Sequence, residues 1–464
     1  MKQLPEALLQ SLQGIKGFDK KAFEEVHASG EQITSIRVNP SKSLEFKNSE
    51  LEVSPVPWSQ YGYYLSKRPS FTFDPLFHAG CYYVQEASSM FLEQALMQLV
   101  DLSQPLKVLD LCAAPGGKST HIQSLISAES VLVSNEVIKS RSNILTDNII
   151  KWGCENVMVT NNDPSAFKKL TGYFDVIVVD APCSGSGLFR RDEDAIDEWS
   201  LNNVALCCQR QQRILADVLP ALKEGGLLIY STCSYSKEED EDIEDWLVSE
   251  LKMENVPIAM GLNIEEEWGI VKTISEKTSS VGYRFFPDRV KGEGFFISCF
   301  RKTTGENEVR NKPSKPETAS SNDRALLQPF LKEERDIIKD KDTYFAFTGT
   351  ALNAFQQLRS FLNIQYKGVE LGQIMKNKLV PSHALALSNI ISDQVARTEL
   401  SYDEAILYLQ RQDLKLETQA TGWQLVTFQK RPLGWINALP NRINNYYPKE
   451  LRILKQSNDS SFGK

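Results

Sequence analysis

Two cysteines stand where they could act on a substrate. Cys183 lies in DAPCSGSG and Cys233 in YSTCSYS, and each follows an apolar run typical of a buried strand. Because parallel strands end at one edge of a sheet, where ligands bind, we expect both thiols at that edge. Together with Asp180 they suit a reaction that needs a nucleophile and a base. Taken singly, each thiol could instead be a buried packing residue.

Methylation of carbon 5 of a pyrimidine is a reaction that needs these groups. That carbon is a weak nucleophile, and addition of a thiolate to carbon 6 activates it. After methyl transfer, a base must remove the proton from carbon 5 so that the thiol can leave. Asp180 could hold the amino edge of cytosine and stabilise charge on the ring. The residues alone leave the two cysteines interchangeable.

The ends of three further predicted strands indicate a methyl-donor site. VLDLCAAPGGKST has Cys112 where a phosphate loop requires glycine, and it also lacks the dinucleotide fingerprint. Its small residues let backbone approach a ligand. Glu136 could accept the hydroxyls of a ribose and Asp163 the amino group of adenine, although an acid at such a junction more often caps a helix. A nucleoside site without phosphate-binding groups fits S-adenosylmethionine.

The elements that carry these residues form an alternating pattern. The apolar runs KVLDLCA, SVLVSNE, NVMVTNND, FDVIVVDAP and GLLIYSTC are separated by segments long enough for helical crossovers, which predicts a parallel sheet covered on both faces. Residues 303–325 are rich in Pro, Ser, Asn and charge and are predicted to be a linker. A smaller unit follows from about Leu326.

Composition narrows the class of protein. The chain has 464 residues, a net charge of -8 and eight cysteines without any C-x-x-C pair, which indicates reduced thiols and no zinc site. It has no signal peptide and no apolar stretch near the roughly 18 residues of a membrane span, so we expect a cytoplasmic protein. The acidic charge argues against a generally basic nucleic-acid coat, but local basic patches can still bind phosphate.

Three motifs carry a resemblance to a known family. VLDLCAAPGGKST, FDVIVVDAPCSGSG and YSTCSYS resemble the signature stretches of the Sun-domain RNA cytosine-5 methyltransferases. HAGCYYVQEASSM resembles the family's entry to the catalytic domain, and GYRFFPDRVKGEGFF its closing hairpin. After the linker, YKGVELGQI, PSHALAL and GWQLVTFQKRPLGW resemble the C-terminal half of the bacterial ribosomal RNA small subunit methyltransferase F type.

The resemblance implies a fold and a division into domains. The fold is α/β: a Rossmann-like S-adenosylmethionine methyltransferase domain with a mostly parallel seven-stranded sheet, an N-terminal α/β extension and a C-terminal PUA-like RNA-binding domain. The expected boundaries are an N-terminal RNA-contact extension over 1–90, the methyltransferase domain over 91–302, the linker over 303–325, an intermediate domain over 326–395 and the PUA-like domain over 396–464.

The resemblance also assigns roles to single residues. Cys233 is implied to be the nucleophile, and Cys183 the thiol that helps to release the product. The implied S-adenosylmethionine site consists of Cys112, Ala113, Ala114, Pro115, Gly116, Gly117, Lys118, Glu136, Asp163 and Asp180. The run SKEEDEDIEDW after Cys233 is interpreted as a solvated first helical turn, which leaves the activation of the thiolate unexplained.

The C-terminal stretch suggests the partner. Residues 430–455 hold six Lys or Arg against one acid, interleaved with Trp435, Tyr446 and Tyr447, a mixture that suits phosphate contact and base stacking. Trp435 could equally be the core of a small barrel. We expect ribosomal RNA or the small ribosomal subunit as partner, with no membrane, no metal and a monomeric chain.

The expected activity is therefore formation of 5-methylcytosine in small-subunit ribosomal RNA. The same chemistry on transfer RNA is the alternative among enzymes, and a non-catalytic ribosome-assembly factor is the alternative from another class. A dehydrogenase is disfavoured, because the dinucleotide fingerprint is missing.

Overall fold

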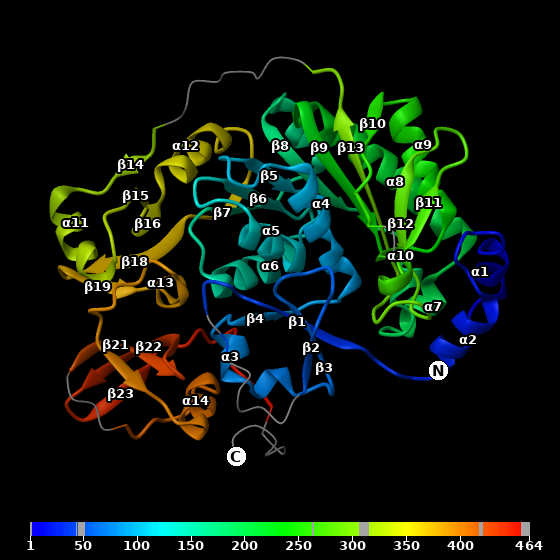
Figure 1. Cartoon of the computed structure of the whole chain (residues 1–464). Helices are drawn as coiled ribbons and strands as arrows, with labels where there is room; N and C mark the ends of the chain where they lie inside the picture. The colour runs from blue at the N-terminus through cyan, green and yellow to red at the C-terminus, as the bar shows by residue number, and fades with distance from the viewer. Residues whose placement is uncertain are drawn as a thin grey trace.

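The computed structural model describes residues 2–42, 44, 52–261, 264–305, 315–416 and 421–455. These residues form four β-sheets with helices packed on them (Figure 1). Within the described ranges, no helix is both long enough and apolar enough to cross a membrane.

The N-terminal unit combines short helices with an antiparallel sheet. Its helices are α1 (Glu6–Ser11), α2 (Lys20–Ala28) and α3 (Pro75–His78). Its strands are β1 (Thr34–Val38), β2 (Val53–Pro55), β3 (Gly62–Leu65) and β4 (Tyr82–Val84), in the order β2-β3-β1-β4. Asp19 caps α2 by accepting a hydrogen bond from the Ala22 N–H. The predicted α/β extension is confirmed.

The central sheet contains the five predicted apolar runs as parallel strands. They are β5 (Lys107–Asp110), β6 (Val131–Asn135), β7 (Val157–Thr160), β8 (Phe174–Asp180) and β9 (Leu222–Thr232). Their spatial order is β9-β8-β5-β6-β7, and every neighbouring pair in this group is parallel. All five therefore end at the same edge of the sheet.

Antiparallel strands extend the sheet on both sides. β10 (Met253–Asn255), β11 (Val271–Ile274), β12 (Val281–Phe285) and β13 (Phe295–Lys302) lie beyond β9, and β17 (Ile364–Lys367) pairs with β7. β12 and β13 form the predicted closing hairpin. The fold class is confirmed, but the sheet has ten strands rather than seven, and only the central five are parallel. Short edge strands such as β10 carry too few residues to show a period in the sequence.

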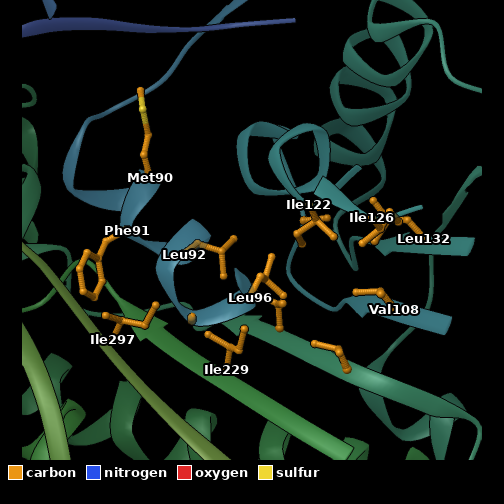
Figure 2. Packing of buried hydrophobic residues seen from close by; sticks show 14 of the residues in the cluster. Met90, Phe91, Leu92, Leu96, Val108, Ile122, Ile126, Leu132, Ile229 and Ile297 are labelled. Atoms are coloured by element: carbon orange, nitrogen blue, oxygen red, sulfur yellow. The ribbon is translucent and has the colours of Figure 1, made fainter. Parts of the chain in front are cut away.

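Helices cover both faces of this sheet. One face packs against α4 (Leu92–Leu99), α5 (Gly117–Leu125) and α6 (Lys139–Trp152), and the other against α8 (Leu201–Val218) and α9 (Glu241–Ser249). Along β9, Ile229 joins the first core and Leu228 the second, as the strand period of two requires. Figure 2 shows Leu92 and Leu96 of α4 against Ile229 and Ile297. Each such fully buried aliphatic side chain stabilises the fold by about 2 kcal/mol. Two shorter helices, α7 (Asp194–Glu198) and α10 (Ile264–Trp268), lie between strands in the chain.

The C-terminal part contains two further sheets. The first has the order β14-β15-β16-β18-β19 and is formed by β14 (Glu317–Thr318), β15 (Asp336–Asp340), β16 (Thr343–Phe347), β18 (Val369–Met375) and β19 (Lys378–Pro381), with α11 (Ser321–Leu327), α12 (Gly349–Leu358) and α13 (His383–Leu387). The second comprises β20 (Arg397–Glu399), β21 (Gly422–Phe428), β22 (Arg431–Leu439) and β23 (Arg442–Asn445), with α14 (Tyr402–Leu409).

The predicted linker is shorter than the sequence suggested. Residues 306–314 lie outside the described residues, but β14 and the start of α11 fall within the expected range 303–325. Ser320 caps α11 by accepting from the Asp323 N–H at 3.1 Å. Serine and aspartate are common both in linkers and at helix starts, so composition could not separate the two.

The C-terminal units pack firmly on the rest of the chain. β17 adds an antiparallel strand to the central sheet, with Ile364 opposite Thr160. The last unit shares a core with the N-terminal sheet, in which Tyr408 and Val426 lie in the same cluster as Ile36 and Tyr82. Figure 1 shows β21, β22 and α14 beside α3.

Candidate active site

The structure brings the two predicted thiols together. β8 and β9 are neighbours, with Asp180 opposite Ser231, so the loops that follow them face each other. The Sγ atoms of Cys183 and Cys233 lie 3.0 Å apart. The Gly187 N–H donates to the carbonyl oxygen of Cys233 at 2.8 Å, and a Cβ at Gly187 would lie only 2.7 Å from that oxygen. Glycine is therefore required where the two loops meet.

The environment distinguishes the two thiols. The hydrogen bond with Cys233, and then burial, raise the pKa of Cys183 well above its usual value. A raised pKa favours the protonated form of Cys183, but either sulfur of the 3.0 Å contact could be the donor. The sequence alone had left the two thiols interchangeable.

An ion pair lies at the same edge of the sheet. Lys118, in the first turn of α5, places Nζ 2.8 Å from Oδ2 of Asp180, whose Oδ1 accepts from the Ser231 hydroxyl at 2.8 Å. Burial works to lower the pKa of Lys118, but the charge of Asp180 and the hydrogen bond to it raise the pKa overall. Lys118 is thus a protonated partner of Asp180, and its Nζ lies 5.2 Å from the centre of the Phe295 ring. The sequence assigned Lys118 only to the cofactor turn.

The turn Cys112–Lys118 follows β5 and includes the start of α5, and hydrogen bonds to its backbone groups hold it in place. The Ala113 N–H donates to the Asn135 carbonyl at 2.8 Å, and the side chains of Arg141 and Asn148 donate to the carbonyls of Ala114 and Pro115 at 2.9 and 2.8 Å. Gly116 has φ +117°, a conformation that side chains other than glycine rarely adopt. Burial raises the pKa of the Cys112 thiol, so this cysteine stays neutral.

Buried acids line the same edge near this turn. Asp110 is fully buried: Oδ2 accepts from the Ser119 hydroxyl at 2.7 Å, whereas Oδ1 has no hydrogen-bond partner among the described residues. Burial raises the pKa of Asp110 to about 7. Glu136 is also buried, with Oε1 accepting from the Ile138 N–H at 2.9 Å and Oε2 3.5 Å from Arg141. Carboxylate oxygens with spare acceptor capacity fit a ligand that donates hydroxyl or amino hydrogens.

Asp163 is placed differently from the other acids. It is exposed and caps a short 3₁₀ helix by accepting from the Ser165 N–H at 3.0 Å, and its Oδ2 lies 3.4 Å from Arg213. The capping role that the sequence left open is confirmed. A contact with adenine stays a prediction.

Most of the acidic run after Cys233 is buried, although Glu238 is exposed. Glu239 and Asp240 are fully buried and Glu241 nearly so. Arg284 pairs with Glu241 through Nε and Nη2, at 2.7 and 2.5 Å, and with Asp240 at 3.0 Å. The interpretation as a solvated first turn was therefore wrong. The interpretation failed because the countercharge, Arg284, lies on β12, more than 40 residues later in the chain. A local sequence pattern cannot reveal such a partner.

The basic and aromatic residues near the C-terminus divide into core and surface. Trp435 is buried and its indole N–H donates to the Ser382 carbonyl at 2.7 Å, which confirms the core alternative. Tyr447 is buried as well, whereas Tyr446 is 42% exposed and packs edge-on against Trp423. The exposed cations of this stretch are Lys430, Arg442, Lys449, Arg452 and Lys455. Among the described residues, no group of three or more His, Cys, Asp or Glu could hold a metal ion.

Comparisons with known proteins match most of the chain. Family models match residues 4–87 (N-terminal domain of 16S rRNA methyltransferase RsmF), 97–301 (16S rRNA methyltransferase RsmB/F) and 395–453 (methyltransferase RsmF PUA domain). Ribosomal RNA small subunit methyltransferase F of Vibrio vulnificus strain YJ016 is 30% identical, over 86% of this chain and 85% of that protein. The protein of the same name from Aliivibrio salmonicida is 29% identical over 97% of each.

Solved structures share the catalytic fold. A methyltransferase homolog from Pyrococcus horikoshii is 28% identical, with a TM-score of 0.53, over 64% of this chain and 93% of that one. NSun6 from Pyrococcus horikoshii, solved with SFG, has the same TM-score at 18% identity, over 65% and 98%, and shows the fold alone. The resemblance drawn from the motifs is confirmed, and the chain belongs to the ribosomal RNA small subunit methyltransferase F family.

Proposed function

We propose that the protein methylates carbon 5 of cytosine in small-subunit (16S) ribosomal RNA, through a covalent adduct between Cys233 and carbon 6 of the base. The observation that carries the proposal is the pair of sulfur atoms 3.0 Å apart, on the loops that follow the neighbouring strands β8 and β9. A protonated neighbour that donates to Cys233 stabilises its thiolate, and the thiolate is the nucleophilic form.

The chain's own residues account for the steps at the base. The Cys233 thiolate attacks carbon 6, forming a carbon–sulfur bond and placing electron density on carbon 5. Lys118 and Asp180, paired at 2.8 Å beside the thiols, are assigned to the polar edge of cytosine, where they stabilise the charge that develops on the ring. After methyl transfer, a base takes the carbon 5 proton, the electron pair of that bond re-forms the double bond between carbons 5 and 6, and the carbon–sulfur bond breaks to return the Cys233 thiolate. Cys183 is assigned to this release step.

S-adenosylmethionine, when bound, supplies the methyl group, and four features of the chain are assigned to it. The Cys112–Lys118 turn keeps side chains out of the way. Glu136 is assigned to the ribose hydroxyls through Oε2. The buried Oδ1 of Asp110, which has no hydrogen-bond partner among the described residues, is a further polar atom at this edge that a ligand can pair with. Asp163 is assigned to the adenine amino group.

The RNA class rests on the relatives and on the C-terminal surface. The relatives are named as methyltransferases of small-subunit ribosomal RNA. The exposed Tyr446 and the cations around it suit an RNA contact that combines stacking with phosphate binding. We place this reaction in the cytoplasm. Transfer RNA is the alternative substrate, because the thiol site does not encode the target.

A denaturing gel tests the proposal directly. The Cys183→Ala variant is mixed with methyl-labelled S-adenosylmethionine and either 16S ribosomal RNA or transfer RNA. Because release is impaired, a labelled protein–RNA adduct should accumulate with 16S RNA, and it should disappear in the Cys183→Ala/Cys233→Ala double variant. An adduct that forms with transfer RNA alone would mean that transfer RNA, and not 16S ribosomal RNA, is the substrate. No adduct and no methyl transfer on any RNA would favour a ribosome-assembly factor without catalytic activity.

A further inference from the structure

Glu239 lies buried between the two loops that carry the cysteines. Its side chain receives hydrogen bonds from four donors. Oε1 accepts from the Ser184 N–H at 2.8 Å and from the Gln211 amide at 3.2 Å. Oε2 accepts from the hydroxyls of Ser184 and Ser234 at 2.5 and 2.7 Å. A carboxylate has about four acceptor positions, so Glu239 is fully occupied and has none left for a substrate.

The donors are the chain neighbours of the two sulfur atoms. Ser184 follows Cys183 directly, and Ser234 follows Cys233. One carboxylate oxygen therefore bridges loops that belong to different strands, at the residues adjacent to the thiols. Gln211 of α8 extends the bridge, because its amide also donates to the Pro182 carbonyl at 3.2 Å.

We propose that Glu239 is a positioning residue, which holds Cys183 and Cys233 at reacting distance by joining the loop after β8 to the loop after β9. The catalytic consequence rests on the proposed function, whereas the spacing of the thiols is a property of the free protein. A misplacement of about 1 Å in a reacting group can lower the rate on the order of a hundredfold. A fixed bridge beside both sulfur atoms prevents such a misplacement.

The bridge requires a carboxylate rather than any polar side chain. Glu239→Gln keeps the size of the residue, but it replaces one acceptor oxygen with an amide group that can only donate. At least one of the links from Ser184 or Ser234 must then weaken. Glu238→Gln is the matched control, because it makes the same chemical change at the preceding position, where the side chain is exposed.

The spacing of the thiols is measured in the full chain without RNA. In a glutathione redox buffer, the two thiols and one oxidised glutathione give an intramolecular disulfide and two reduced glutathiones. Mass spectrometry of the joined Cys183 and Cys233 peptides gives the equilibrium constant. For Glu239→Gln it should be at least about tenfold lower than for the wild type and for Glu238→Gln. An unchanged constant, or a wild-type chain that does not form this disulfide, would overturn the proposal.

Measurements of turnover distinguish a role of Glu239 in positioning the thiols from a general loss of stability. Glu239→Gln should lower kcat by about a hundredfold while KM for RNA and the Kd of S-adenosylmethionine stay unchanged. Adding Ser184→Ala and Ser234→Ala to Glu239→Gln should lower kcat little further, because the three residues act as one unit. An unchanged kcat overturns the catalytic part of the proposal.

The disulfide measurement still tests the role of Glu239 if the variant does not fold or if the wild type is inactive. If Glu239→Gln does not fold, Ser234→Ala alone removes one link, and its disulfide equilibrium decides: a lowered constant supports the bridge, and an unchanged one overturns it. If the wild type transfers no methyl group to any RNA, the proposed function fails, while the disulfide equilibrium still tests Glu239.

Discussion

The candidate site lies where the parallel strands of the central sheet end, and its two halves differ in how many of their polar groups have a hydrogen-bond partner. At the ends of β8 and β9, Asp180 is paired with Lys118 and Ser231, Cys183 with Cys233, and Glu239 with four donors. At the ends of β5 and β6, the buried Asp110 has an oxygen without a partner among the described residues, and Oε2 of Glu136 has the half-exposed Arg141 at 3.5 Å.

The difference indicates that the thiol half of the site is complete in the free protein, whereas the cofactor half is completed by its ligand. The thiol edge is preorganised, because the protein itself supplies the partners and catalysis requires fixed distances. The cofactor edge keeps acceptor capacity for a ligand, and it carries the cost of burying polar groups without full partners until the ligand binds. Changes at the first edge should therefore affect turnover, and changes at the second should affect ligand affinity and stability.

The largest effect is expected at the preorganised edge. Asp180→Asn keeps the shape of the side chain but removes the countercharge of the partly buried Lys118. Loss of a fixed charge at the reacting base should lower kcat on the order of a thousandfold, with less than a threefold change in the Kd of S-adenosylmethionine. Single-turnover kinetics and calorimetry measure the two quantities. A large loss of affinity with normal turnover of the saturated enzyme would reverse the assignment of this edge.

A second effect should appear as a pH dependence of stability at the cofactor edge. Burial raises the pKa of Asp110 from the ordinary 3.8 to about 7, so between these pH values the folded chain holds a proton that the unfolded chain releases. Stability from this group is fully present below pH 3.8, falls as pH rises and is lost above about 7. The loss is on the order of 3 kcal/mol. It is smaller than the full pKa difference would give, because the buried site relaxes when Asp110 ionises.

Asp110→Asn should remove this dependence. Without ligand, the variant should gain stability over the wild type as pH rises from 4 to 8, in urea unfolding followed at each pH. Asn can still accept from the Ser119 hydroxyl, so the variant is matched in shape. A variant that loses stability at high pH would mean that Asp110 is ionised and paired.

A smaller effect is expected for the ribose contact. Glu136→Ala should raise the Kd of S-adenosylmethionine by about thirtyfold, since hydrogen bonds to a charged group contribute about 2 kcal/mol. The rate constant at saturating cofactor should be unchanged, because the thiols are held by other residues. Arg141→Ala is the comparison variant: it keeps the carboxylate but removes both the cation next to Oε2 and the hydrogen bond to the Ala114 carbonyl, so it measures the indirect effects on the cofactor turn. An unchanged Kd in Glu136→Ala would exclude the ribose contact.

The sequence predicted those parts of the site that depend on a single strand and the loop after it. The five apolar runs, the small-residue turn and the two cysteines are local patterns, and parallel pairing puts their ends at one edge. The partnership of Lys118 with Asp180 joins residues from different strand ends, and nothing in the spacing of the two motifs shows it. Lys118 could be assigned only to the turn in which it lies.

The errors share the same origin. The acidic run looked solvated because two of its partners, Arg284 and Ser184, are distant in the chain. The strand β17 could not be assigned to the central sheet, because it lies after the expected linker and its residues IQYK show no buried run. Burial and edge pairing depend on tertiary contacts, which a local pattern does not contain.

The smallest effect is expected for Asp163, where the structure and the resemblance suggest different roles. As the cap of a short helix, Asp163→Ala should cost about 1 kcal/mol of stability and leave the Kd of S-adenosylmethionine within threefold. As a partner of adenine, it should raise that Kd about tenfold or more, because a charged acceptor would be lost. Asp163→Ser decides between the two, since serine can still cap the helix at the Ser165 N–H but does not supply a carboxylate. Full stability with weakened binding in Asp163→Ser would assign the residue to the ligand. Restored stability with unchanged binding would restrict it to the cap, and the cofactor edge would then be formed by the ends of β5 and β6 alone.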